Sequence, residues 1–164
     1  MSTSDNVFVA RRESVAEAAG WLAGVLGLDP VADPDLKEDE RLFRRSARSG
    51  TGTLAVVVRP NGFAVADPEP DEIQALDQYP IDLGVRLIGT NDEEWQLRET
   101  RSVFADLVAA RPEVPALLVH NLDTLVSAHL PGAGTHTFNP PITPDVEDID
   151  TWRPWVVGRR SSDV

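Results

Sequence analysis

Three histidines and an aspartate are the residues of this sequence whose types best suit metal binding or acid–base chemistry. They are His120, Asp123, His129 and His136. His120 and His129 flank a predicted hairpin, across which they could approach each other. Their spacing differs from the i, i+4 pair that zinc enzymes carry on a helix, and no second carboxylate is fixed nearby. We therefore predict no metal ion and no other cofactor, and expect partly buried histidines that hydrogen-bond to their neighbours.

Nucleophilic chemistry has weaker support. The sequence contains no cysteine. Ser127 and His129 lie two residues apart on a predicted strand, where they would share a face without forming a triad. Gly132 to Thr135 could suggest a phosphate loop, but prolines follow it where a helix would have to begin. We predict a plain turn there and no catalytic residue. The alternative is a small enzyme or ligand-binding domain that uses a pocket formed by His120 and His129.

The charge of the chain limits its partners. It has 27 acidic residues against 15 lysines and arginines, a formal net charge of −12. Such a field repels phosphate backbones and anionic lipids and attracts basic proteins, although it could also serve only solubility. One basic cluster, Arg41, Arg44, Arg45 and Arg48, has a single aromatic neighbour, so we expect these arginines to pair with acids. We predict a protein partner, with a basic one favoured, and neither nucleic acid nor membrane.

The compartment follows from what the sequence lacks. The absence of cysteine suits a reducing environment. The N-terminus does not have the basic region and long apolar run of a signal peptide. The longest apolar runs, 54–58 and 116–119, are too short to cross a bilayer. We expect a cytoplasmic protein.

The first periodic segment predicts a helix from Ser14 to Leu26. Its apolar residues recur at spacings of three and four, which builds one stripe. Ser14 and Glu17 have the spacing of a capping box, and Gly27 can end the helix in a left-handed conformation. A loop rich in acids and prolines follows, over 29–40.

Sequence patterns then predict a run of strands. The expected segments are Arg41–Ala47, Leu54–Arg59, Phe63–Ala66 and Ile81–Leu87. The second is apolar and β-branched, and the turn residues Pro60-Asn61-Gly62 would return the third antiparallel to it. The last alternates apolar and polar residues, as a strand with one buried face does.

A second helix is predicted from about Thr90, with Thr90 or Asn91 as its cap and Pro112 closing it. Asp92, Glu93 and Glu94 lie in its first turn, where the helix dipole favours acids. If the partner is basic, these three acids are our candidate partner-binding residues, because an exposed acidic surface would steer its association.

The remainder of the chain predicts two strands and a proline-rich end. The strands cover Ala116–His120 and Thr124–Leu130, joined by a turn at 121–123. We divide the chain into an α+β domain over 1–130 and an acidic extension over 131–164 that packs on the same domain. Trp152 and Trp155 make that extension too apolar for an unattached tail.

Together these elements predict an α+β fold. We expect one antiparallel sheet of five to six strands with two helices on one face, in the order α-β-β-β(-β)-α-β-β. This order and the acidity resemble the type III secretion chaperone-like fold over Ser14–Leu130. The stretches Arg86–Trp95 and Leu117–Asp123 resemble small actinobacterial proteins, some of which are similar to immunity partners of toxins. The resemblances imply a non-catalytic protein-binding module, like an immunity protein or a secretion chaperone, and allow a homodimer.

Overall fold

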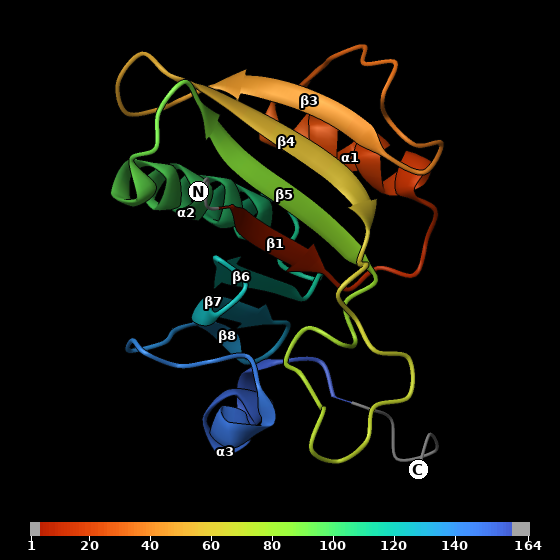
Figure 1. Ribbon diagram of the computed structural model, residues 1–164, viewed down its shortest axis with the longest axis vertical. Coiled ribbons are helices and arrows are strands. Elements are labelled where there is room, and N and C mark those ends of the chain that lie inside the picture. The colour runs from red at the N-terminus through yellow and green to blue at the C-terminus, as the bar shows by residue number, and fades with distance from the viewer. Residues whose placement is uncertain (1–3, 159–164) are drawn as a thin grey trace.

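A computed structural model describes residues 4–158 and shows an α+β fold built on one antiparallel sheet. The sheet has eight strands in the order β2-β3-β4-β5-β1-β6-β7-β8 (Figure 1). The strands are β1 (Asp5–Val9), β2 (Asp29–Pro30), β3 (Arg41–Ser46), β4 (Thr53–Pro60), β5 (Ile81–Ile88), β6 (Ala116–His120), β7 (Thr124–Leu130) and β8 (Gly134–Thr137). Every pair of neighbouring strands in it is antiparallel. The expected fold class is therefore confirmed.

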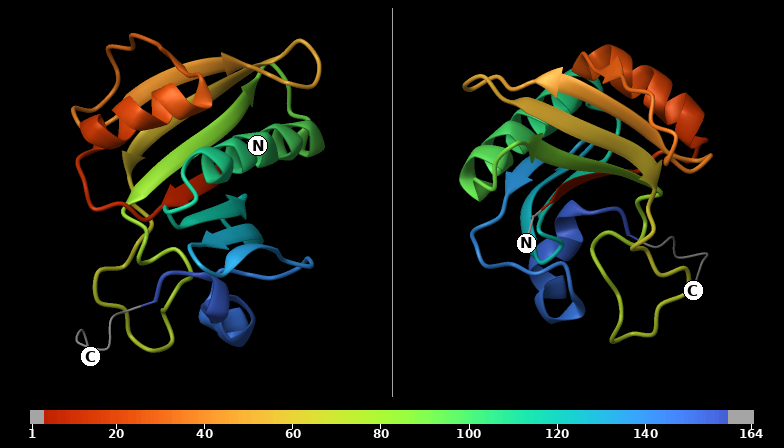
Figure 2. Two further views of the ribbon diagram at one scale, coloured as in Figure 1. Left: turned by 180° about the vertical axis from the view of Figure 1, so that it is seen from behind. Right: turned by 45° about the horizontal axis from the view of Figure 1, so that its top comes forward.

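Both long helices lie on one face of the sheet, α1 (Val15–Leu26) over β3 and β4 and α2 (Glu93–Ala110) over β5, β1 and β6 (Figure 2). Their apolar stripes meet the alternate side chains of these strands in one buried cluster. The ends of α1 are as predicted: the Ser14 hydroxyl accepts a hydrogen bond from the Glu17 amide, and Gly27 has a φ of 65°. The apolar periodicity of the sequence thus determines which face of each helix packs on the sheet, since only one face of each helix is apolar.

A second apolar cluster covers the opposite face of β1, β6 and β7 only. Phe8, Leu117 and Leu125 of the sheet pack there against the loop 61–80 and the C-terminal segment. That segment contains two short 3₁₀ turns, η1 (Val146–Asp148) and η2 (Arg153–Trp155), on either side of α3 (Ile149–Trp152). Trp152 is buried, and its indole N–H donates to the carbonyl of Asp145 at 2.9 Å. The C-terminal segment is thus packed on the sheet through residue 156.

Three strands and one helix were not foreseen. The expected count of five to six strands is wrong because β1, β2 and β8 add to the sheet. The expected two helices become three with α3. The strand β1 is the most consequential, because it lies between β5 and β6 and joins the two halves of the sheet.

The predicted strand at Phe63–Ala66 is an irregular loop. β4 pairs with β5 along its whole length, Pro60 opposite Ile81, so the place beside it is already taken. The loop is held by side chains instead. The Asn61 amide donates to the carbonyls of Leu76 and Tyr79, at 3.0 and 2.8 Å.

Within residues 4–158, none of the helices combines the length and the hydropathy that crossing a bilayer requires.

Candidate functional site

Within residues 4–158, no helix or loop covers one half of one face of the sheet (Figure 1). The surface of β3, β4 and β5 opposite α1 and α2 has neither helix nor loop over it in Figure 1, whereas the C-terminal segment covers only the neighbouring half. We call this surface the open face. Its residues are those that alternate with the buried ones along each strand: Leu42, Arg44, Thr53, Ala55, Val57, Gly84, Arg86 and Ile88.

Strand register arranges the open face in rows. Ala55 lies directly between Arg44 on β3 and Arg86 on β5, and Val57 lies between Leu42 and Gly84. Leu42, Ala55 and Val57 are half-buried, Arg44 and Arg86 are exposed, and Ile88 is 53% exposed. Within residues 4–158, neither arginine side chain has a hydrogen bond or an ion pair. A small apolar strip with two unpaired cations beside it is a surface suited to recognition.

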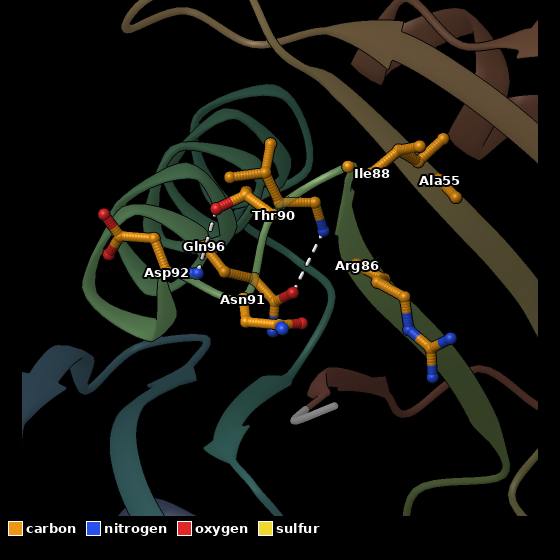
Figure 3. A pocket seen from close by; sticks show the side chains of 9 residues that line it. Ala55, Arg86, Ile88, Thr90, Asn91, Asp92 and Gln96 are labelled. Carbon is orange, nitrogen blue, oxygen red and sulfur yellow. Dashed lines mark hydrogen bonds between the residues drawn. The ribbon is translucent and has the colours of Figure 1, made fainter. Parts of the chain in front are cut away.

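A cavity of about 540 Å³ opens from this face at the end of β5. It is bounded by Ala55, Arg86 and Ile88 from the sheet and by residues 89–92 and Gln96 from the turn into α2 (Figure 3). The turn uses most of its own polar groups. The Thr90 hydroxyl accepts from the Asp92 amide, and the Gln96 side chain accepts from the Leu87 amide at 3.0 Å. Among the residues that line the cavity, no hydrogen bond joins a nucleophilic side chain to a basic one.

Of the three acids predicted for partner binding, only Asp92 lines this cavity; Glu94 lines a separate, more open hollow beside Ser49 and Trp95. Asp92 is the N-cap of α2, and its carboxylate accepts a hydrogen bond from the Trp95 amide at 3.0 Å. Neither Thr90 nor Asn91 takes that position, which corrects the expected cap. Glu93 and Glu94 are exposed in the first turn. Asp92 therefore has a structural role, while the two glutamates face solvent.

A buried ion pair closes the far end of the open face. Asp82 is fully buried; one carboxylate oxygen accepts from Arg59 Nε at 2.9 Å and the other from the Asn6 amide at 2.8 Å. Burial raises the pKa of Asp82, and the hydrogen bonds from Asn6 and Arg59 only partly oppose this. The Arg59 guanidinium also lies over the Phe63 ring. Asp82 itself is buried by these contacts, whereas the Arg59 side chain and Phe63 are partly exposed.

The histidines do not form one site. His120 lies opposite Thr124 and His129 opposite Ala116, at the two ends of the β6–β7 pair. At about 3.4 Å per residue, four residues separate them by roughly 14 Å. His129 is buried, with its ring nitrogens bonded to the Thr135 hydroxyl and the Pro112 carbonyl. His136 stacks on Trp155. Within residues 4–158, no three His, Cys, Asp or Glu side chains cluster as metal ligands would.

His120 instead belongs to a buried polar chain beneath α2. Its Nδ1 lies 2.5 Å from one oxygen of Asp5, whose other oxygen lies 2.9 Å from the Thr100 hydroxyl. Because the carboxylate stands between the hydroxyl and the imidazole, the imidazole cannot take a proton from the hydroxyl as a triad requires. Asp5 and Thr100 are fully buried, so we assign the chain a structural role.

The arginine cluster divides between two faces. Arg45 and Arg48 both bind Asp106 of α2, with Arg45 Nη1 at 3.1 Å, as the expected pairing with acids requires. Arg44 points to the open face. The glycine segment at 132–134 is a turn, in which the Ala133 amide donates to the Leu130 carbonyl.

Sequence reasoning missed the buried polar residues. Asp5 and Asn6 belong to a strand that was not foreseen, and its only signal was the short apolar run Val7-Phe8-Val9. Asp82 occupies a polar position of the alternating β5 pattern, which indicates solvent, yet Arg59 and Asn6 enclose it. Alternation shows which face a side chain takes but does not show what covers that face.

Comparisons with protein-family models, with curated proteins and with solved structures found no match to this chain.

Proposed function

We propose that this protein is a non-catalytic protein-binding module whose partner docks on the open face. The observation that carries the proposal is the row Arg44–Ala55–Arg86, in which two exposed and unpaired arginines flank a half-buried apolar position. Within residues 4–158, the two arginines pair with no acid, and the apolar position between them is only half-buried. A partner would bury the strip and satisfy the charges.

The site favours recognition over catalysis because its polar groups are engaged. Asp92 and Thr90 hold the turn into α2, and Asp82 is bound by Arg59. The alternative that relied on His120 and His129 has little support, because the two rings lie at opposite ends of a strand pair and His129 uses both nitrogens. An adaptor role resembling that of an immunity protein or a secretion chaperone suits a surface of this kind.

Glu93 and Glu94 provide a second contact in this proposal. They are exposed in the first turn of α2, directly after Asp92, which lines the cavity that opens from the open face. Long-range attraction by exposed acids speeds association with a basic partner more than it slows dissociation. A basic segment of the partner would reach these acids while the body of the partner lies on the open face.

Site-specific photo-crosslinking in the source organism tests the proposal. Benzoylphenylalanine replaces Ile88, which is exposed on the open face, and replaces Ala16, which is exposed on α1, as the control. We expect one discrete protein adduct from position 88 and none of that mass from position 16. The same adducts from both positions, or none from position 88, would contradict the proposal. With the captured partner in hand, Glu93→Gln with Glu94→Gln should slow association and weaken its dependence on salt.

A further inference from the structure

We infer that the segment that binds the open face is an amphipathic α-helix with acidic residues on both sides of its apolar stripe. The inference rests on the proposed function and specifies the chemistry of the partner. It follows from the shape of the face, from its charges, and from the state of the backbone beneath it.

We call the strip of the open face along β4, with the side chains of Thr53, Ala55 and Val57, the channel, and the strands β3 and β5 on either side its walls. Long side chains flank the strip on both walls only in the row of Ala55, where Arg44 lies on β3 and Arg86 on β5. Leu42 flanks Val57 opposite Gly84, and Ile88 flanks Thr53 opposite Ser46. Since neighbouring strands are about 4.8 Å apart, β3 and β5 are roughly 10 Å apart, so a helix of about that diameter that lies over β4 would place its two flanks above them.

The backbone of β4 excludes an added strand as the occupant of the channel. β4 lies between β3 and β5 and pairs with both, so its amides and carbonyls are already engaged in the sheet. A segment on top of it meets side chains only and must satisfy its own backbone groups. A helix does this internally. From Thr53 to Val57 the floor is about 14 Å long, which three helical turns would cover.

The positive charges of Arg44 and Arg86 favour acidic residues on both sides of the apolar stripe of that helix. Arg44 and Arg86 stand on opposite walls at the same level of the channel, on either side of Ala55. Glutamates on both flanks of a helix centred over Ala55 would each meet one arginine, and Arg–carboxylate pairs can form two hydrogen bonds. The cavity beside Ile88 can receive a large apolar side chain from the end of the stripe. Lysines at the same flanks would meet like charge.

Designed peptides test the inference. The probe is a hydrocarbon-stapled helix of about 14 residues with a leucine stripe and glutamate on both flanks, because unstapled helices of this length are marginal. The control peptide has the same sequence with lysine in place of each flanking glutamate. Binding is measured by fluorescence anisotropy to the native protein and to two doubly reversed variants. Arg44→Glu with Arg86→Glu alters the channel; Arg12→Glu with Arg101→Glu makes the same charge change at exposed positions away from it.

We expect the glutamate peptide to bind the native protein about tenfold more tightly than the lysine peptide. Charge reversal at Arg44 and Arg86 should make the lysine peptide the tighter binder. Charge reversal at Arg12 and Arg101 should leave the glutamate peptide the tighter binder. If the first variant does not fold, Arg44→Gln with Arg86→Gln should abolish the preference. Equal binding of both peptides, absence of saturable binding, or a preference unchanged by the channel variants overturns the inference. A crosslinked partner at position 88 combined with such a result would leave the proposed function intact.

Discussion

Arg59 Nε lies 2.9 Å from Oδ2 of Asp82, and this pair lies at the end of the open face where β4 ends and β5 begins. The two residues are cross-strand neighbours on β4 and β5. Asp82 is fully buried, while Arg59 is partly exposed. A carboxylate so placed depends on Arg59 and Asn6 to remain charged, since water does not reach it.

Arg59→Met should therefore destabilise the fold by about 2 kcal/mol at neutral pH, less than for a fully buried pair because Arg59 is partly exposed. Since burial already raises the pKa of Asp82, loss of Arg59 raises it further. The carboxyl then protonates more readily, so the cost of the substitution should shrink as the pH falls. Urea denaturation at neutral and acid pH measures this. Arg44→Met, on the same face without a partner, is the control and should change stability by less than about 0.5 kcal/mol.

Glu99 should make the protein sensitive to acid. It is buried and accepts hydrogen bonds from the amides of Arg48 and Ser49 and from the Ser49 hydroxyl. Burial raises the pKa of Glu99, but these hydrogen bonds and the charge of Arg45 outweigh burial and hold it below the usual value. A lowered carboxyl pKa stabilises the folded state above the unfolded-state pKa, and this contribution is lost as the pH falls through the folded-state pKa.

Glu99→Gln should accordingly lower the free energy of unfolding by about 2 kcal/mol at pH 7. The difference from the native protein should narrow as the pH falls below the usual range of a glutamate pKa and Glu99 becomes protonated. Urea titrations across this range measure the difference, with Glu94→Gln, an exposed glutamate on the same helix, as control. A difference in unfolding free energy that does not change with pH would contradict a lowered pKa for Glu99.

The buried chain of Thr100, Asp5 and His120 should contribute to stability alone. Thr100→Val preserves shape but removes the hydroxyl beside the Asp5 carboxylate, so we expect a loss of about 1.5 kcal/mol. Ser102→Ala, which removes an exposed hydroxyl two residues along α2, should be nearly neutral. Chemical denaturation compares the two variants. Equal losses of stability in the two variants would show that the hydrogen bond between Thr100 and Asp5 does not stabilise the fold.

Trp152 should be the residue that holds the C-terminal segment on the sheet. It is 3% exposed, whereas Trp155 is half-buried and stacks on His136. Trp152→Ala should cost about 3 to 5 kcal/mol, and Trp155→Ala clearly less. Deletion of 151–164 should lower the melting temperature by several degrees or make the protein insoluble. An unchanged melting curve for Trp152→Ala would mean that the rest of the fold is stable without this packing.

Residue patterns predicted part of the candidate site. The apolar, β-branched run at 54–59 and the alternation along 81–87 each predicted a strand, and the structure confirms both strands. The alternation also placed Arg86 away from the core. It could not show that Arg44, assigned to an ion-pairing cluster with Arg45 and Arg48, would face the other way. On a strand, adjacent residues take opposite faces, so the four clustered arginines divide between the two sides of the sheet.

Local sequence by itself determined the elements whose signals are local. Ser14, Gly27 and the acids before Trp95 set helix ends through hydrogen bonds to nearby backbone, and apolar periodicity set which helix faces are buried. Only the tertiary structure decided that Asp5–Val9 joins the two halves of the sheet and that the chain covers one half of its second face while leaving the other open. Those outcomes depend on pairings between residues far apart in the sequence, such as Asp5 with Val85 and His120, and no local pattern specifies them.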